Sequence, residues 1–254
     1  MEYCRIAAMR LFVFTMAWWE SHEHAWAQAP VLNKWLSDVQ YYFKPWHVFV
    51  ACGTWSDPIH SPLPNYVPTI NGGVKKDRPY NAVWWNYAGS AISAALAYSL
   101  TRCDWDAVIM HDTDALIGAV DFDALLKDFL ERPETFLCSQ WYGRPGGGSI
   151  TAWKPAAAVK WLNQRRRANL IEHAEGDPVP MLLEDEMGEI YKGEWWNPWP
   201  QFQTMRQDFG WPSAAPEMEP LEKAWPFVRL PHPSIVEDYA RTQTSLAKGV
   251  QSGV

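Results

Sequence analysis

Two kinds of hydrophobic segment alternate along the chain. Apolar runs too short for a helix predict strands, and longer segments with apolar residues three or four positions apart predict helices. The expected strands cover residues 11–15, 46–52, 106–110 and 135–139. The expected helices cover residues 30–43, 82–100, 122–130 and 155–167. This alternation predicts an α/β fold whose central sheet is mostly parallel and is flanked by helices.

The segments between and after these elements differ from them in composition. Residues 57–80 hold five prolines and an Asn-Gly-Gly cluster, which predicts a loop. Asp121 precedes the helix expected at 122–130 and is its expected N-cap. Beyond residue 167 the chain is rich in proline and tryptophan, which predicts long loops over one end of the sheet. Residues 241–254 are polar, and we expect a flexible tail there.

Composition narrows the class of protein. A chain of 254 residues that is 48% hydrophobic can form one large domain or two small ones. Its formal net charge of −7 argues against a protein whose main role is to bind phosphate backbones. The four cysteines lie far apart, so neither a zinc site nor a disulfide framework is indicated. We expect Cys52 and Cys138 to be buried thiols of a cytoplasmic protein.

The start of the chain allows an alternative interpretation as a targeting signal. Arg10, the apolar residues 11–19 and the sequence Ala25-Trp26-Ala27 resemble a short signal peptide with its cleavage site. Two glutamates and two histidines within residues 20–24 oppose this interpretation, because that segment should be small and neutral. No run approaches the roughly 18 apolar residues of a membrane span.

The segment Ala107–Leu116, AVIMHDTDAL, is the most informative for function. Its apolar residues predict a buried parallel strand, and Asp112 and Asp114 follow where that strand ends. Burying charge is costly, so two carboxylates at this place need a stabilising partner. A divalent cation would be such a partner, and Mg²⁺ or Mn²⁺ prefers oxygen ligands of this kind.

The chain contains 17 tryptophans, an unusual number. The indole face stacks on sugar rings or bases, while its N–H group donates a hydrogen bond. We expect most tryptophans to pack in the core and two or three to line a binding site. The segment 194–202, EWWNPWPQF, is the best candidate for such a site.

The order of elements, the Asp-x-Asp motif, the glycine-rich residues 144–150 and the acidic Glu184-Asp185 pair together resemble a known family. The chain is similar to nucleotide-sugar glycosyltransferases of the GT-A fold, nearest to the inverting family 2 type, over about residues 10–235. The resemblance implies one catalytic domain over residues 1–240. Residues 10–120 would then form the half that binds the nucleotide sugar, and residues 121–240 the half that binds the acceptor.

The resemblance also implies roles for particular residues. Asp185 matches the family's catalytic base, with Glu184 or Glu186 as substitutes. The residues that the resemblance assigns to the donor, a UDP-sugar by expectation, are Thr15, Ala17, Asp57, Asp112 and Asp114. The ligands that it implies for Mn²⁺ or Mg²⁺ are Asp112, Asp114 and His232. The residues expected at the acceptor are Gly147, Gly148, Trp195 and Trp196.

Each of these positions also has a structural interpretation. The two aspartates could cap a turn or helix, and the Glu184-Asp185 pair could be the acidic first turn of a helix. The glycines could form a surface loop, and His232 could be a structural histidine. His111 is expected to be a turn histidine with ordinary hydrogen bonds, and Arg165-Arg166-Arg167 a solvated helix end.

The acceptor and the reaction class stay open at this point. The hydroxyl acceptor could be a glycan, a small molecule, a protein side chain or a hydroxymethylated base in DNA. A nucleotidyltransferase can share the sheet architecture, but the glycine-rich basic loop expected after the first strand is missing here. A phosphatase with an Asp-x-Asp nucleophile would carry that motif after its first strand. A tryptophan-rich carbohydrate-binding protein would need no carboxylates on a parallel sheet.

Overall fold

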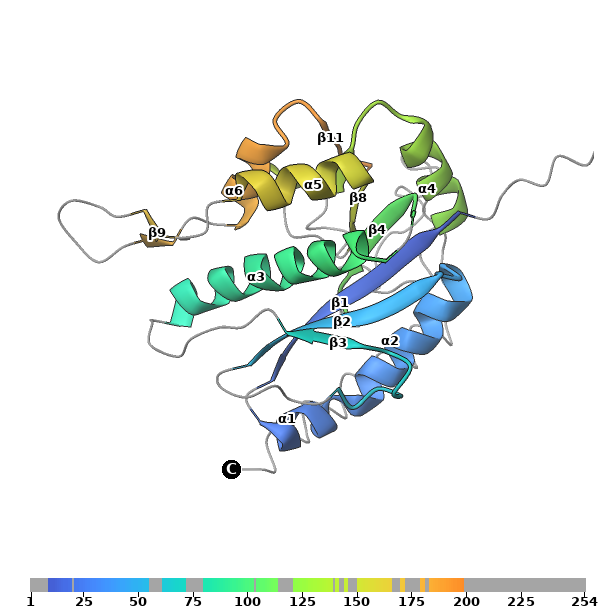
Figure 1. The fold of residues 1–254 in the computed structure, drawn as a ribbon, viewed down its shortest axis with the longest axis vertical. Coiled ribbons are helices and arrows are strands. Elements are labelled where there is room, and N and C mark those ends of the chain that lie inside the picture. The colour runs from blue at the N-terminus through green and yellow to red at the C-terminus, as the bar shows by residue number, and fades with distance from the viewer. Residues whose placement is uncertain are drawn as a thin grey trace, which may run out of the picture.

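The computed structural model describes residues 9–19, 21–54, 61–71, 80–102, 104–113, 121–138, 140–141, 144–145, 150–165, 170–171, 179–180 and 183–198. Its centre is a seven-stranded sheet (Figure 1). In spatial order the strands are β11 (Trp195–Trp196), β5 (Phe136–Cys138), β8 (Ile150–Trp153), β4 (Ala107–His111), β1 (Leu11–Trp19), β2 (His47–Thr54) and β3 (Thr69–Asn71). Only β8 runs against its neighbours β4 and β5 within this sheet. The expected mostly parallel α/β sheet is therefore confirmed.

The described helices are α1 (His22–Ala27), α2 (Ala29–Tyr42), α3 (Tyr80–Leu100), α4 (Phe122–Glu131), α5 (Pro155–Gln164) and α6 (Leu183–Ile190). Two short antiparallel pairs complete the elements: β6 (Gln140–Trp141) with β7 (Arg144–Pro145), and β9 (Leu170–Ile171) with β10 (Val179–Pro180). The Asp121 side chain accepts a hydrogen bond from the Ala124 backbone N–H, so the predicted N-cap of α4 is confirmed.

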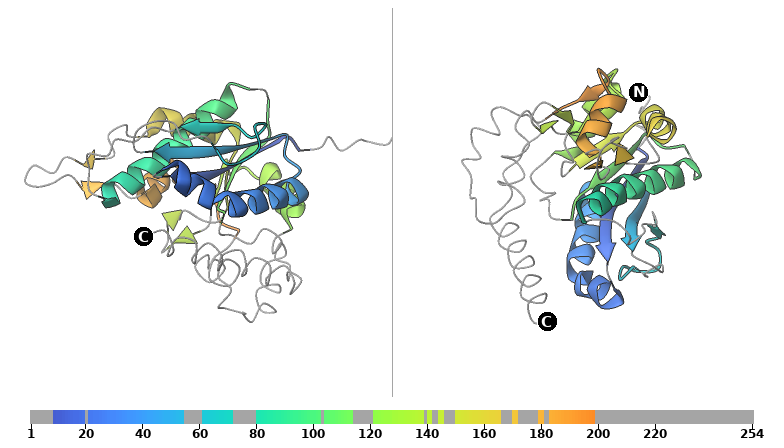
Figure 2. Two further views of the ribbon diagram at one scale, coloured as in Figure 1. Left: turned by 90° about the horizontal axis from the view of Figure 1, so that it is seen from below. Right: turned by 90° about the vertical axis from the view of Figure 1, so that its left-hand side faces the viewer.

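Helices cover both faces of the sheet. Successive strand residues point to opposite faces, and the buried side chains accordingly form two clusters. One cluster joins the sheet to α1, α2 and α4, and the other joins it to α3, α5 and α6. The left view of Figure 2 shows α2 and α5 on opposite sides of the sheet.

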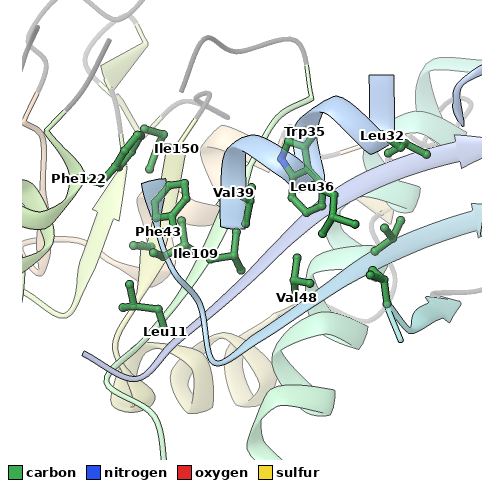
Figure 3. Packing of buried hydrophobic residues seen from close by; sticks show 14 of the residues in the cluster. Leu11, Leu32, Trp35, Leu36, Val39, Phe43, Val48, Ile109, Phe122 and Ile150 are labelled. Atoms are coloured by element: carbon green, nitrogen blue, oxygen red, sulfur yellow. The ribbon is translucent and has the colours of Figure 1, made fainter. Parts of the chain in front are cut away.

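Helix α2 shows how the sequence pattern produces this packing. Proline stands in its first turn, where no backbone N–H is needed for the helix ladder. Its apolar residues recur at helical spacing, and Figure 3 shows Trp35, Leu36 and Val39 directed at the sheet. Phe43, just after the helix, lies 4.1 Å from Phe122 of α4 between ring centroids. Burial of such side chains contributes about 1.5–3 kcal/mol each.

Helix α3 packs against the other face through small residues. Ala88, Ala91 and Ala95 are at most 2% exposed and lie against the sheet. Small side chains let the helix axis approach the strands closely.

The amino ends of β1 and β4 are tied together by one residue pair. The backbone N–H of Arg10 donates to Asp106 Oδ2 at 2.7 Å, and Arg10 Nη2 donates to Oδ1 at 3.0 Å. The Asp106 backbone N–H donates in turn to the carbonyl of Arg10. Partial burial raises the pKa of Asp106, but the two hydrogen bonds from Arg10 and its positive charge together bring this pKa below its ordinary value. The pair therefore fixes the register of the two central strands.

Several element boundaries differ from the prediction. Strand β1 extends to Trp19 and lies between β2 and β4, so the apolar part of the segment considered as a signal peptide is an interior strand of the sheet. Strand β3 falls inside the predicted loop 57–80, and β8 and β11 were not predicted. Cys52 and Cys138 are buried thiols, as expected. None of the described helices is long and apolar enough to span a membrane.

Candidate functional site

The carboxyl ends of the parallel strands meet at one edge of the sheet, which we call the carboxyl edge. Ligands of open α/β sheets bind outside this edge. Strand β4 is buried over its whole length, and Asp112 follows its last residue directly. Asp112 is half-buried, so the chain places a carboxylate between the core and solvent at this edge. The predicted buried strand with an aspartate at its carboxyl end is thus present.

The predicted metal ligands are only partly described. Asp114 and His232 lie outside the described residues, which leaves Asp112 as the described member of the set. Among the described residues, no three His, Cys, Asp or Glu side chains gather in a way that would hold a metal ion. Hard cations such as Mg²⁺ prefer carboxylate oxygens as ligands. The metal site at this edge stays a prediction.

Two buried polar side chains lie just inside the carboxyl edge. Phe14 pairs with Met110 in the β1–β4 register, so Thr15 and His111 come one residue further along their strands. Both are directed to the face covered by α2 and α4, and they are 0% and 1% exposed. Within the described part of the chain, neither the Thr15 hydroxyl nor either ring nitrogen of His111 makes a hydrogen bond.

His111 differs from the turn histidine that the sequence suggested, and that prediction was wrong. It is the last residue of β4 and packs edge-on against Phe43 and Phe122, with ring centroids 5.9 Å and 6.3 Å away. Burial lowers the pKa of His111 to about 3, against the opposing effect of the neighbouring Asp112 backbone. His111 is therefore a neutral imidazole at neutral pH.

Ala17 and the two adjacent tryptophans occupy different parts of the sheet. Ala17 is buried in β1, on the same face as Thr15 and two residues closer to the carboxyl edge. Trp195 and Trp196 form β11, where they pair with Phe136 and Leu137 of β5. Trp196 stacks on Phe129 and lies under the Arg132 guanidinium, 4.1 Å from ring centroid to Cζ. The structure does not bring the two tryptophans to the carboxyl edge, and their role at an acceptor site stays a prediction.

Helix α6 carries Glu184 and Asp185 in its first turn, as the structural interpretation above expected, and their catalytic role stays a prediction. Tyr191, the residue after α6, donates a hydrogen bond from Oη to the carbonyl of Ala157 near the start of α5, at 2.9 Å. The end of α6 therefore lies beside the start of α5, and the two helices run in opposite directions. Strand β8 is antiparallel, so α5 starts at the amino edge and ends toward the carboxyl edge. The first turn of α6 therefore lies on the carboxyl-edge side of the molecule.

A buried polar cluster joins this turn to α3 and α5. Arg165, the residue after α5, is predicted above to be solvated, but its side chain is only 11% exposed. Its Nε lies 3.7 Å from Glu186 Oε1 of α6, and its Nη1 donates to Ser93 Oγ of α3 at 2.9 Å. Trp161 Nε1 donates to the same oxygen at 3.0 Å. The prediction of a solvated helix end is thus wrong for Arg165, because helix packing encloses it.

Several predicted site residues fall on parts of the chain that the structure does not describe. These are Asp57, Asp114, Gly147, Gly148 and His232. The side chains of Glu184 and Asp185 are likewise not described, although their helix is. The roles of these residues stay predictions.

The sequence pattern did not lead us to predict that Arg165 and Glu186 form a buried ion pair. Within an Arg-Arg-Arg run nothing distinguishes a buried guanidinium from a solvated one. The available signal was the helical spacing of Trp161 and Arg165, since residues four apart share one face of a helix. Trp161 is 0% exposed, so the residue one turn later on the same face was a candidate for burial.

Comparison with known proteins finds solved structures that resemble this chain at low sequence identity and low TM-score. No protein-family model matches the chain, and no curated protein does. Among solved structures the chain is similar to the galactosyltransferase LgtC in complex with donor and acceptor sugar analogues. The identity is 12%, the TM-score is 0.47, and the match covers 93% of this chain and 95% of that chain.

Two further solved structures are similar to the chain. The glycosyltransferase GlyE of Streptococcus pneumoniae TIGR4 has 11% identity and a TM-score of 0.43, and the match covers 96% of this chain and 64% of that chain. A 4-diphosphocytidyl-2C-methyl-D-erythritol synthase of Anaerococcus prevotii DSM 20548 has 9% identity and a TM-score of 0.34, with 72% and 84% covered. Values this low do not establish an activity for this chain.

Proposed function

We propose that this protein is a glycosyltransferase of the GT-A type that transfers a sugar from a nucleoside diphosphate sugar, by expectation a UDP-sugar, to a hydroxyl acceptor. The observation that supports the proposal is that two acidic segments lie on the carboxyl-edge side of the molecule. Asp112 follows the buried central strand β4, and the first turn of α6 approaches the same edge from the layer formed by α3, α5 and α6. The proposed catalytic domain spans residues 1–240, with a donor half at 10–120 and an acceptor half at 121–240.

The proposed reaction assigns one task to each segment. Asp185 accepts the proton of the acceptor hydroxyl as its oxygen attacks the anomeric carbon, with Glu184 as its substitute. The bond from that carbon to the diphosphate oxygen breaks, and its electron pair leaves with the nucleoside diphosphate. Attack opposite the leaving group inverts the anomeric configuration. Asp112 and Asp114 are the residues that we propose to face the diphosphate of the donor.

A divalent cation fits this arrangement through the chemistry of its proposed ligands. Carboxylates are hard oxygen donors, and Mn²⁺ also accepts an imidazole nitrogen, so Asp112, Asp114 and His232 are the proposed ligand set. When bound, the cation would neutralise charge on the leaving diphosphate. Thr15, Ala17 and Asp57 are proposed to line the nucleotide side, and Gly147, Gly148, Trp195 and Trp196 the acceptor side.

A donor screen tests the proposal. The protein is incubated with Mn²⁺ and each of a panel of UDP-, GDP-, CDP- and dTDP-sugars, and its thermal midpoint is measured. We expect one nucleotide class to raise the midpoint, and the corresponding sugar nucleotide to release nucleoside diphosphate when a suitable acceptor is added. NMR of the product then gives the anomeric configuration, which distinguishes inversion from retention.

The same assay identifies the competing reaction classes. Release of pyrophosphate would indicate nucleotidyl transfer, and release of inorganic phosphate a phosphatase. Sugar binding without release of any nucleotide would indicate a binding protein. Hydroxymethylated DNA belongs in the acceptor panel beside glycans and small hydroxyl compounds, because the chain's acidity disfavours a DNA acceptor without deciding against it.

A further inference from the structure

The buried polar cluster between α3, α5 and α6 links the proposed catalytic turn to the scaffold. The cluster consists of Gly89, Ser93, Trp161, Arg165 and Glu186. Arg165 and Glu186 are 11% and 7% exposed at their side chains. Burial lowers the pKa of Arg165, and the opposed charge of Glu186 raises it in compensation. The two charged groups therefore depend on each other in the interior.

The surrounding residues are shaped to receive the guanidinium. The Ser93 hydroxyl donates to the carbonyl of Gly89 at 2.8 Å, which leaves its lone pairs for Arg165 and Trp161. A Cβ atom at position 89 would collide with Nη2 of Arg165. The Arg165 Cζ atom also lies 5.8 Å from the centroid of the Trp161 ring. Each of the three helices thus contributes a group that fixes Arg165.

A buried ion pair of this kind is not an efficient way to stabilise a fold. The desolvation of two charges offsets much of their attraction, and apolar residues of similar size often give equal or greater stability. The ion pair instead contributes orientation, because a guanidinium held by several partners fixes the position of the carboxylate that it contacts. This pair holds the fourth residue of α6, directly after Asp185.

Helix geometry connects the pair to the proposed base. Glu186, Met187 and Ile190 are buried, which defines the inner face of α6. With about 3.6 residues per turn, position 185 lies on the opposite face of the helix. A small rotation of α6 about its axis would therefore change the direction in which position 185 faces.

We propose that Arg165 is a positioning residue that acts through Glu186 and holds the first turn of α6 in the orientation required for sugar transfer. The inference rests on the proposed function, because it assigns the transfer step to that turn. Arg165 contacts neither donor nor acceptor in this account. Its loss should reduce kcat while the KM for the donor stays nearly unchanged.

The test separates orientation from stability with a double substitution. Arg165→Met alone leaves the Glu186 charge buried, and we expect it to lower the thermal midpoint and kcat. Arg165→Met with Glu186→Leu replaces the pair with apolar side chains, and we expect the midpoint to return to within a few degrees of the parent value. We expect kcat of the double variant to stay about 10–100-fold low, with the donor KM within threefold of the parent.

Lys160→Met is the matched control. Lys160 Nζ lies 2.7 Å from Glu194 Oε1, so this pair joins α5 to the turn after α6 at the far end of the same helix. Both side chains are partly exposed. We expect this substitution to leave kcat within about twofold of the parent, because it breaks an ion pair between the same regions without releasing the first turn.

Hydrogen exchange supplies a readout that does not depend on activity. In the double variant, the backbone amides of residues 186–190 should exchange faster, while those of the central strands keep their protection. A double variant that regains both stability and kcat, or whose α6 amides exchange as slowly as in the parent, would overturn the inference. A parent protein that releases no nucleoside diphosphate would instead overturn the proposed function, and the exchange rates would still decide whether Arg165 holds the turn.

Discussion

The two ends of the central sheet are built differently. At the amino edge, Arg10 and Asp106 join the starts of β1 and β4 through two backbone-anchored hydrogen bonds and an ion pair. Toward the carboxyl edge, the same two strands contain Thr15 and His111, buried polar side chains without hydrogen bonds in the described part of the chain. Asp112 then follows, half exposed.

This contrast leads us to expect that the two edges of the sheet have different roles. Hydrogen bonds at the amino edge satisfy polar groups and fix strand register, which are contributions to stability. Buried polar groups without partners are costly, and structures retain them mostly where function requires them. We therefore expect substitutions at the amino edge to change stability, and substitutions at the carboxyl edge to change activity.

Among the substitutions that test this contrast, we expect Asp185→Asn to have the largest effect on activity. If Asp185 is the base, its loss should lower kcat by about 10²–10⁴-fold, because general base catalysis contributes a factor of that size. The donor KM and the free energy of unfolding should change little. Steady-state kinetics and urea unfolding check this, with Glu189→Gln as the control, since Glu189 is an exposed residue of the same helix. Equal kcat in the two variants would contradict the assignment.

Asp106→Ala tests the amino edge and should have the opposite outcome. The substitution removes the acceptor for the backbone N–H and the guanidinium of Arg10, so we expect the free energy of unfolding to fall by about 1–2 kcal/mol. Because the pKa of Asp106 is lowered in the folded protein, its contribution is present above the carboxyl's ordinary pKa and is lost as the pH falls through the folded value. Urea unfolding at pH 7 measures the change, and kcat should stay within about twofold.

His111 should produce a smaller effect that depends on pH. Its pKa falls from 6.5 to about 3 on folding, so the unfolded chain binds a proton between these values that the folded protein does not. The contribution of His111 to the free energy of unfolding should be complete above pH 7 and should decline below about pH 6.5. The free energy of unfolding should fall by about 1 kcal/mol between pH 7 and pH 5.5 for this reason. His111→Leu should flatten this part of the curve of unfolding free energy against pH. An unchanged slope in the variant would show that His111 is protonated in the folded protein.

Elements with strong local patterns could be predicted from the sequence. The spacing of Val31, Trp35 and Val39 predicted α2, and the apolar residues before Asp112 predicted the buried central strand β4. The helix expected over residues 82–100 likewise corresponds to α3.

Elements whose formation depends on tertiary contacts could not be predicted. Strand β11 has two residues and exists because Trp195 and Trp196 pair with β5. Strand β8 carries no local signal for its antiparallel direction. Helical spacing from Trp161 makes Arg165 a candidate for burial, but its partners Ser93 and Glu186 lie 72 and 21 positions away in the chain. Local periodicity contains no information about such distant partners.

The central claim is that Asp112 belongs to a donor site at the carboxyl edge. It is tested most directly by Mn²⁺-dependent nucleoside diphosphate release from the parent, Asp112→Asn and Asp104→Asn, the last being an exposed aspartate before β4 at the opposite edge. We predict that Asp112→Asn lowers release at least 100-fold with an unchanged thermal midpoint in the absence of donor, while Asp104→Asn behaves as the parent. Equal release by Asp112→Asn and Asp104→Asn would contradict the claim.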